Sequence, residues 1–203
     1  MWDVKIMKII LASKSPRRRE ILSGLGLRFD IVGADCDESS DILDPSALVS
    51  ELALRKGRAV RALLLSQGKL SGDTLIIASD TVVSLDGEIL GKPKDTAEAV
   101  SMLTRLSGRS HRVTSGIALL TCDKEAAAFE STDVTFSHVS PFEIERYVAS
   151  GEPMDKAGAY AVQGGAAIWI EGLRGDYYNV VGLPVHRLDV LSREFLGRGL
   201  LEL

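Results

Sequence analysis

The sequence predicts an α/β domain of the mixed α+β kind, in which helices flank a mixed, twisted sheet. Short apolar runs at 8–12 and 74–85 are typical of buried strands, and apolar residues recur at helical spacing after Asp44. The 203 residues suffice for one hydrophobic core, and no linker, internal repeat or low-complexity tract divides them. We therefore expect a single domain over residues 8–203.

The first half of the chain alternates strands and helices. Ser15 and Asp44 are suited to cap helices, and each is followed by a proline that fits the first helical position, Pro16 and Pro45. In order, we expect a strand at 8–12, a helix that starts at 16 and stops at 24–26, a strand at 28–32, and a long helix from 45 that closes within 66–73.

The second half carries a hairpin signal and two capping signals. Asp86-Gly87 is a two-residue turn, Asp95 and Glu98 have capping-box spacing, and Ser140 stands before a helical pattern. In order, we expect strands at 74–85 and 88–90, a helix ending at 108, strands at 113–121 and 128–139, a helix ending at 151, glycine-rich strand or loop segments at 156–164 and 167–173, and a final helix opened by Pro184.

Charge and cysteine content exclude several classes of protein. The 24 Lys+Arg against 28 Asp+Glu give a net charge of -4, which disfavours a protein that coats nucleic acid. Cys36 and Cys122 form no CxxC and fit a reducing compartment. No run is apolar enough for a membrane span, and the first ten residues lack a signal-peptide layout, with Met7 an alternative start. We expect a cytoplasmic protein.

Asp80 breaks the pattern of the most apolar predicted strand. It lies between Ile77 and Val82, where a strand buried on both faces would normally carry no carboxylate. Because burial of a lone charge is costly, we expect Asp80 at a strand end that faces a wet cleft, a cation or both. The alternative is a turn or capping aspartate that bonds to its own backbone.

Two lysines are also out of place. Lys56 falls on the inward stripe of the long helix, where a lysine either acts chemically or extends its ammonium to solvent along its own methylenes. Lys92 is held between Gly91 and Pro93 in a short loop, and its alternative is an ordinary solvated turn lysine.

The remaining candidates are an acidic pair, an arginine cluster and a glutamine. Asp37 and Glu38 follow a strand and would, beside Asp80, offer the hard oxygen ligands that Mg²⁺ or Mn²⁺ prefers, although acidic runs are mostly solvated surface. Arg17 and Arg18 stand at a strand-to-helix junction and suit an anion, although such a run is commonly a solvated first turn. Gln163 is followed by glycines that would let a planar ligand approach, and its alternative is an ordinary turn residue.

Basic groups set against two carboxylates are what metal-assisted attack of water on a polyphosphate requires. The cations neutralise the nonbridging oxygens while a carboxylate holds the metal and orients water. No Ser-His-Asp order, nucleophile elbow, Walker loop or GxGxxG is present, and the three histidines receive no chemical role.

Eight blocks of the sequence resemble, in order, the motifs of the Maf-type nucleoside triphosphate pyrophosphatases. They are "LASKSPRRREIL", "DE" at 37–38, "LALRKGRA", "ASDTVV", "GKPKD", "LSGRSHRVTSG", "YVASGEPMDKAGAYAVQG" and "YYNVVGLP". The resemblance as a whole covers roughly residue 8 to residue 196. The resemblance implies a cytoplasmic enzyme with the elongated, two-lobed α/β architecture of inosine triphosphatases and a cleft between the lobes. It also implies that the enzyme uses a divalent cation, Mg²⁺ or Mn²⁺.

The resemblance also implies roles for individual residues. Asp80 resembles the catalytic acid that acts as general base or holder of the metal-bound water, and Glu38 resembles its partner at the metal. Lys56 and Lys92 are expected to act on the triphosphate from the lobe opposite the two arginines. The triphosphate-binding positions are Ser13, Arg17, Arg18, Lys56 and Lys92, and the positions that set specificity are Arg17, Thr81 and Gln163.

The specificity positions resemble the branch that acts on dTTP and UTP. We therefore expect hydrolysis to the monophosphate and pyrophosphate, with poor discrimination against CTP, in clearance of unwanted nucleotides. The alternatives are a 7-methyl-GTP-type pyrophosphatase, a nucleotide-sensing regulator of septum formation, and a nucleic-acid module built on "SPRRR". A homodimer is expected from the resemblance, with no nucleic acid and no membrane among the partners.

Overall fold

The computed structural model describes residues 7–203. The first six residues, which belong to the segment judged to lack a signal-peptide layout, lie outside this range. Within it, no helix combines the length and the apolar character needed to cross a membrane.

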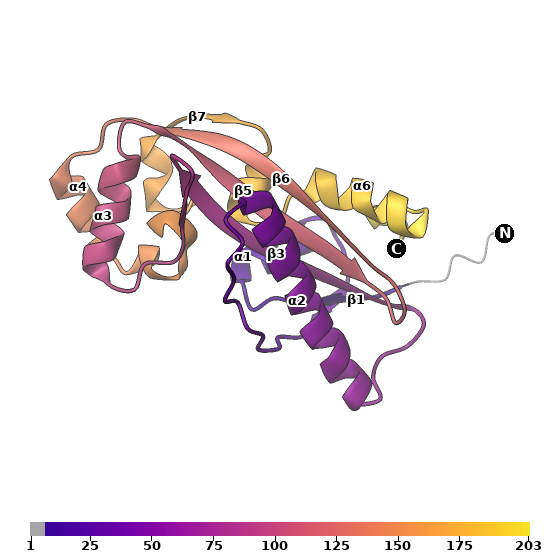
Figure 1. Ribbon diagram of the computed structural model, residues 1–203. Coiled ribbons are helices and arrows are strands. Elements are labelled where there is room, and N and C mark those ends of the chain that lie inside the picture. The colour runs from indigo at the N-terminus through magenta and orange to yellow at the C-terminus, as the bar shows by residue number, and fades with distance from the viewer. Residues whose placement is uncertain (1–6) are drawn as a thin grey trace. The chain divides into compact units, whose positions relative to one another are not determined.

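The described chain forms a mixed sheet of seven strands, with helices against it (Figure 1). The strand order is β2-β1-β3-β5-β6-β7, and β4 pairs with β3. β1 pairs in parallel with β2 and β3, whereas the pairs β3-β4 and β6-β7 are antiparallel. The mixed α/β class is confirmed. The strands are β1 (Lys8–Leu11), β2 (Phe29–Ile31), β3 (Thr74–Leu85), β4 (Glu88–Leu90), β5 (Ser110–Leu120), β6 (Glu125–Phe136) and β7 (Ile170–Arg174).

The contacts divide the chain into two compact units. The first unit contains the described chain as far as Asp80, with Ser115–Glu130 and Gly182–Leu203. The second contains Thr81–Thr114 and Ser131–Val181. Three long strands pass from one unit into the other. The expected single domain over 8–203, its elongation and its central cleft stay predictions.

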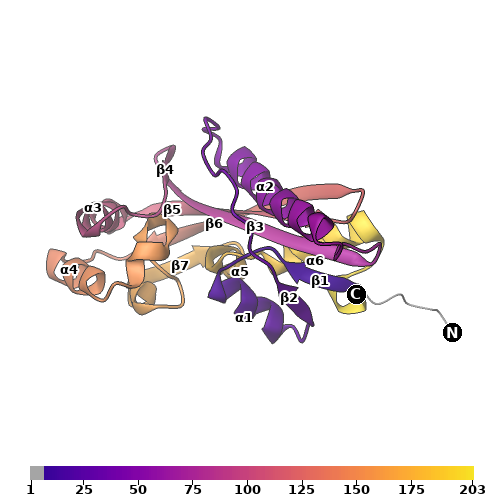
Figure 2. The same cartoon turned by 90° about the horizontal axis from the view of Figure 1, so that it is seen from below.

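In the first unit, helices cover both faces of the sheet. Figure 2 shows α2 (Pro45–Ser66) on one side of β1 and β3, and α1 (Pro16–Gly24) and α6 (Val185–Leu196) on the other. Because successive side chains of a strand point to opposite faces, each strand contributes to both layers. The core between α2 and the sheet includes Ile10, Ala12, Ala53, Val60, Leu64, Ile76, Ala78, Ala118 and Leu120.

Two glycines let α2 approach the sheet closely. A Cβ on Gly116 of β5 would lie 2.1 Å from the carbonyl oxygen of Val49, and one on Gly57 would lie 2.2 Å from Cδ1 of Leu120. Either added carbon would push the helix away, since real contacts of this kind are far longer. Gly57 follows Lys56 directly, so this close approach fixes the helix backbone beside that lysine.

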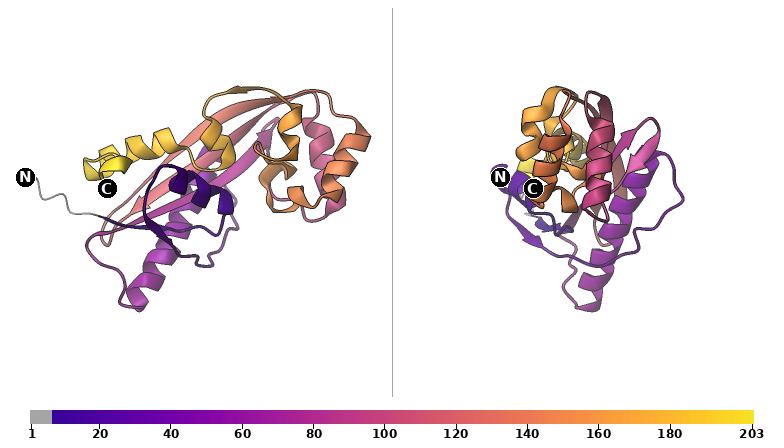
Figure 3. Two further views of the ribbon diagram at one scale, coloured as in Figure 1. Left: turned by 180° about the vertical axis from the view of Figure 1, so that it is seen from behind. Right: turned by 90° about the vertical axis from the view of Figure 1, so that its left-hand side faces the viewer.

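The second unit has an aromatic-rich core beneath two short helices. Figures 1 and 3 show α3 (Thr96–Leu106) and α4 (Pro141–Ala149) side by side. The 3-10 turns Glu152–Asp155, Ala157–Ala159 and Gly165–Trp169 and the short helix α5 (Tyr177–Val181) complete the unit, and a last 3-10 turn, Leu200–Glu202, belongs to the first. The core includes Val83, Leu103, Phe136, Ile144, Tyr147, Tyr160 and Trp169.

The predicted turn and most of the predicted caps are confirmed. Asp86 and Gly87 both adopt positive φ, 54° and 82°, as a two-residue hairpin requires. Asp44 accepts a hydrogen bond from the Ala47 amide, and Ser140 forms a complete capping box. Ser15 is the exception: it occupies the N-cap position, but its side chain makes no capping bond, and its amide donates to Ser13 Oγ instead.

The boundaries of β5 and β6 differ from the expected ones by one to three residues. Both strands begin three residues earlier than predicted, at Ser110 and Glu125 rather than at 113 and 128. The start of β5 alternates exposed and buried residues, with His111 as a buried member, and an apolar count overlooks a buried histidine. The helix α5 was not predicted either, because five residues give too short a periodic signal.

His111 lies in the aromatic core of the second unit and is 4% exposed. Its Nε2 is 2.7 Å from the Tyr160 hydroxyl, and the rings of Phe136 and Tyr160 meet it edge to face. Within residues 7–203, its Nδ1 has no hydrogen-bond partner. Burial therefore lowers the pKa of the imidazole to about 4, although Asp133 opposes the shift.

This histidine should make folding sensitive to mild acid. The unfolded chain takes up the proton near pH 6.5 and the folded chain only near pH 4, so the free energy of unfolding should fall between these values by up to about 3 kcal/mol. Denaturant unfolding of the protein between pH 4 and 8 measures the slope. His111→Phe should flatten it and the exposed His138→Phe should not; an unchanged slope in His111→Phe would contradict the assignment.

Candidate functional site

Asp80 lies inside β3, with 8% of its surface exposed. The expectation of a strand end is therefore wrong, and so is the alternative of an aspartate that caps its own backbone. The charge is tolerated because Lys56 Nζ donates to Asp80 Oδ1 at 2.5 Å. β1 pairs with β3 only as far as Ile77, so Asp80 stands just beyond the carboxyl end of β1. Ligands of open α/β sheets bind outside such ends.

Lys56 bridges the two carboxylates named from the sequence. Besides Asp80, its Nζ lies 3.2 Å from Glu38 Oε1, and its side chain is only 18% exposed. It therefore does not extend into solvent. Lys56 was expected to act from the lobe opposite Arg17 and Arg18. This expectation is wrong, because all three residues belong to the first compact unit.

Glu38 is held in reach of Lys56 by an arginine that the sequence analysis did not select. Arg55 donates from Nη1 to the carbonyl oxygens of Ser39, at 2.8 Å, and Asp37, at 3.4 Å, on either side of Glu38. Its Nε pairs with Glu51 one helical turn earlier. The i,i+4 spacing of Glu51 and Arg55 was visible in the sequence, but the carbonyl contacts were not.

Ser13 and Arg18 form a second part of the site. Ser13 Oγ accepts from the Ser15 amide at 3.2 Å and from Arg18 Nη1 at 3.3 Å. Arg18 Nε donates to the carbonyl oxygen of Gly182 at 2.8 Å, and Ser79 Oγ donates to the same oxygen at 2.9 Å. The guanidinium is thus anchored through one edge to the backbone before any ligand arrives.

The two parts of the site share one electrostatic environment. Burial lowers the pKa of Arg18, the carboxylates of Asp80 and Glu38 raise it, and the neighbouring Arg17 lowers it. Such interactions require these charges to lie near one another. The first unit alone therefore assembles Ser13, Arg17, Arg18, Glu38, Lys56 and Asp80.

The three other predicted residues belong to the second unit. Thr81 follows Asp80 in β3 and makes polar contacts. Lys92 is exposed in a loop whose Gly91 carbonyl accepts from the Gly158 amide at 3.0 Å. Gln163 is exposed in a turn closed by the Gly164 amide on the Ala161 carbonyl. Their roles toward a triphosphate or a base stay predictions.

The carboxylates of Glu38 and Asp80 fit a magnesium-type cation. Among residues 7–203, no group of three or more His, Cys, Asp or Glu side chains could hold a metal. Mg²⁺ in phosphate-handling sites is commonly bound through one or two carboxylates, with substrate phosphates and water as its other ligands. Lys56 already bridges both carboxylates, so a cation would compete with its ammonium for the same oxygens.

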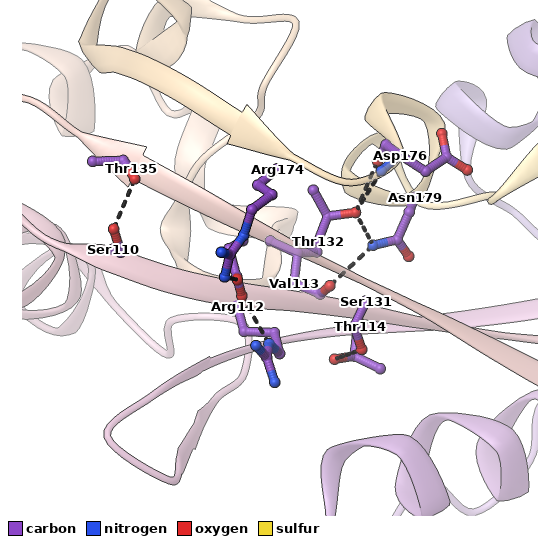
Figure 4. A network of polar contacts seen from close by, with 11 residues as sticks. Ser110, Arg112, Val113, Thr114, Ser131, Thr132, Thr135, Arg174, Asp176 and Asn179 are labelled. Atoms are coloured by element: carbon purple, nitrogen blue, oxygen red, sulfur yellow. Dashed lines mark hydrogen bonds and ion pairs between the residues drawn. The ribbon is translucent and has the colours of Figure 1, made fainter.

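The motif "YYNVVGLP" contributes an anchor rather than a reactive group. Figure 4 shows Asn179 of α5 donating to the carbonyl oxygen of Val113, at 3.0 Å, and to Thr132 Oγ1, at 2.9 Å. Thr132 in turn exchanges two hydrogen bonds with the backbone of Asp176. Asn179 is fully buried, so the asparagine fastens α5 to β5 and β6.

Comparison with known proteins identifies the family of the chain. The sequence pattern described as Maf-like protein matches residues 8–195. The chain belongs to the Maf family. A dTTP/UTP pyrophosphatase of Symbiobacterium thermophilum is 49% identical over 191 residues, which are 94% of this chain and 95% of that protein. One of Alkaliphilus oremlandii, with the same name, is 46% identical over 96% of this chain and 99% of its own.

A solved structure provides a weaker likeness. The Staphylococcus aureus Ham1 protein is 16% identical, with a TM-score of 0.45 over 64% of this Maf-family chain and 71% of its own. The match to the Maf pattern, in contrast, includes the blocks that carry the six assembled residues of the first unit.

Removal of the bridging ammonium should weaken the fold. In Lys56→Met the nearly buried carboxylate of Asp80 loses its counter-ion, so the free energy of unfolding should fall by about 3 kcal/mol. Denaturant unfolding at neutral pH measures the change. Lys8→Met, which removes a pair whose side chains are 49% and 66% exposed, is the control and should change little. Equal stability of the two variants would mean that Lys56 and Asp80 are not coupled.

Proposed function

We propose that the chain is a nucleoside triphosphate pyrophosphatase that hydrolyses dTTP and UTP to the monophosphate and pyrophosphate. The observation that carries the proposal is the pairing of Lys56 with both Asp80 and Glu38, in the unit that also contains Ser13, Arg17 and Arg18. Full-length relatives that are 46–49% identical bear the name dTTP/UTP pyrophosphatase, which supports the same activity.

The charges of the site suit a triphosphate with an attacking water. Arg17 and Arg18 would hold nonbridging oxygens through paired N–H donors, and Ser13 and Lys92 would add further contacts. Arg18 is already anchored through Nε on the Gly182 carbonyl oxygen and through Nη1 on Ser13 Oγ. Arg18 would therefore meet the phosphates with little reorganisation.

Asp80 would orient the attacking water and accept its proton. Attack at the α-phosphorus breaks the bond to the oxygen that bridges the α- and β-phosphates, so pyrophosphate leaves and the monophosphate remains. A divalent cation, Mg²⁺ or Mn²⁺, when bound by Glu38 and Asp80, supplies charge neutralisation and acidifies water. With Glu38 and Asp80 holding such a cation, Lys56 would be available to neutralise the phosphates.

Base selection is assigned to Gln163, with Arg17 and Thr81 as further specificity residues. The edge of uracil or thymine presents an acceptor, a donor and an acceptor. One amide can accept from N3–H and donate to O4. Cytosine reverses these groups, and an amide can flip to suit it, so CTP should be a substrate unless neighbours lock Gln163. Purines would be excluded by size.

Several expectations accompany the proposal without supporting it. A cytoplasmic location, a homodimer, a role in clearing unwanted nucleotides, and the exclusion of nucleic acid and membrane partners rest on composition and on the family resemblance. The acidic net charge of -4 is consistent with a small anionic substrate bound by local basic residues.

Asp80→Asn should separate chemistry from binding. The amide keeps the size of the side chain but cannot take a proton from water, so kcat for dTTP should fall at least ~10²-fold while nucleotide affinity is retained. Pyrophosphate release with Mg²⁺ or Mn²⁺ measures turnover, and titration calorimetry measures affinity. Asp30→Asn, at an exposed position of β2, is the matched control. Near-normal turnover in Asp80→Asn would remove Asp80 from this role.

Gln163→Glu should change the substrate profile. A carboxylate cannot donate to O4, so kcat/KM for dTTP and UTP should fall ~10-fold or more relative to other triphosphates. The measurement is pyrophosphate release across common triphosphates and 7-methyl-GTP, with Gln67→Glu at the exposed end of α2 as control. A variant that keeps its preference for dTTP and UTP would refute base reading by Gln163.

A further inference from the structure

Glu152 lies near Gln163 in the second unit, and hydrogen bonds hold both its backbone and its carboxylate. Its backbone amide donates to Ser150 Oγ at 3.2 Å, and its backbone carbonyl oxygen accepts from Lys156 Nζ at 2.5 Å. With the backbone held on both sides, the carboxylate has a defined direction. Its two oxygens accept from the Gly165 amide, each at 3.2 Å.

Tyr147 of α4 links the Glu152 carboxylate to the backbone that precedes Gln163. Its hydroxyl donates to Glu152 Oε1 at 2.8 Å and accepts from the Ala161 amide at 3.3 Å. The ring is 8% exposed and packs edge to face on Trp169. Ala161 and Gly165 each lie two residues from Gln163, so a single tyrosine-glutamate pair fixes the backbone on both sides of it.

The glycines after Gln163 allow this contact. A Cβ on Gly164 would lie 1.9 Å from Glu152 Oε1, and one on Gly165 would lie 3.1 Å from Cε2 of Tyr147. Gly164 has an ordinary φ of -106°, so the requirement is space and not backbone conformation. The two glycines therefore serve the approach of Glu152 and Tyr147, and not only that of a planar ligand, as the sequence suggested.

We propose that Glu152 and Tyr147 are positioning residues for Gln163, which hold the turn 161–165 so that the glutamine amide is presented to the pyrimidine base. The proposal rests on the proposed function and deepens it, since it assigns base selectivity to a supporting pair as well as to the reading residue. Neither side chain touches the substrate in this scheme.

The physical reason is pre-organisation. A turn with two consecutive glycines is unusually free in the unfolded backbone, and within residues 7–203 no hydrogen bond restrains the Gln163 side chain. If the turn had to become ordered when the nucleotide binds, that cost would lower the affinity for the base. A turn that is already fixed avoids this cost. Loss of the Tyr147–Glu152 pair should thus weaken recognition of the base and leave that of the phosphates unchanged.

The test compares a ligand that has a base with one that has none. Affinities for α,β-methylene-dTTP, which resists cleavage at the reacting bond, and for inorganic tripolyphosphate are measured by titration calorimetry. Glu152→Ala and Tyr147→Phe should each weaken the methylene analogue by roughly tenfold without changing tripolyphosphate binding, and should raise KM for dTTP more than they lower kcat. Glu152→Gln, which can still accept through Oε1, and the exposed Glu145→Ala are controls that should resemble the parent protein.

A double-mutant cycle decides between positioning and general support of the fold. If Glu152 acts through Gln163, Glu152→Ala should have almost no further effect on the analogue in a Gln163→Ala background. Additive effects, or equal weakening of tripolyphosphate, would overturn the proposal. Thermal melts identify any variant that fails to fold; should Glu152→Ala do so, Tyr147→Phe carries the cycle, because it removes only one oxygen.

The outcome also separates this inference from the proposed function. A parent protein that releases no pyrophosphate from dTTP contradicts the proposed function itself. A parent protein that hydrolyses dTTP, and loses base affinity in Gln163→Ala but not in Glu152→Ala or Tyr147→Phe, overturns the positioning role alone.

Discussion

A carboxylate within the most apolar strand requires a cation beside it, and the pairing of Asp80 with Lys56 meets this requirement. The close packing of α2 on the sheet at Gly57 and Gly116 sets the helix at the depth from which Lys56 reaches β3. The same ammonium contacts Glu38, so the loop that Arg55 holds is part of the same arrangement. The rest of the site lies where β1 ends near Asp80, because the chain continues from there into the Ser13–Arg18 segment.

Much of the architecture could be read from the chain because it depends on local signals. Strands that are largely apolar, such as β1 and β3, and helices with a capping aspartate or serine, such as α2 and α4, have the expected positions. Charged residues that interrupt apolar patterns identified Asp80 and Lys56, because the energetic penalty of a buried charge is large enough to mark its position in the sequence. The arginine cluster could not be separated from a solvated turn until its contacts with Ser13 and Gly182 were known.

The supporting residues could not have been predicted in the same way, since their partners are backbone atoms. Arg55 binds the carbonyls of Asp37 and Ser39, and Glu152 binds the amide of Gly165; no sequence pattern records which carbonyl or amide a side chain will meet. His111 was missed as a strand residue because a histidine counts as polar, yet here it is packed among aromatic rings. Asp80 was placed at a strand end because its partner on α2 lies 24 positions away along the chain.

The boundary between the compact units falls between Asp80 and Thr81, so the proposed reactive groups and the proposed base reader are encoded in different structural modules. Mutations that alter the turn around Gln163, or the tyrosine and glutamate that support it, do not remove any residue of the Lys56–Asp80 pair. Under the proposed function, nucleobase preference could therefore change through this turn while the buried carboxylate keeps its counter-ion.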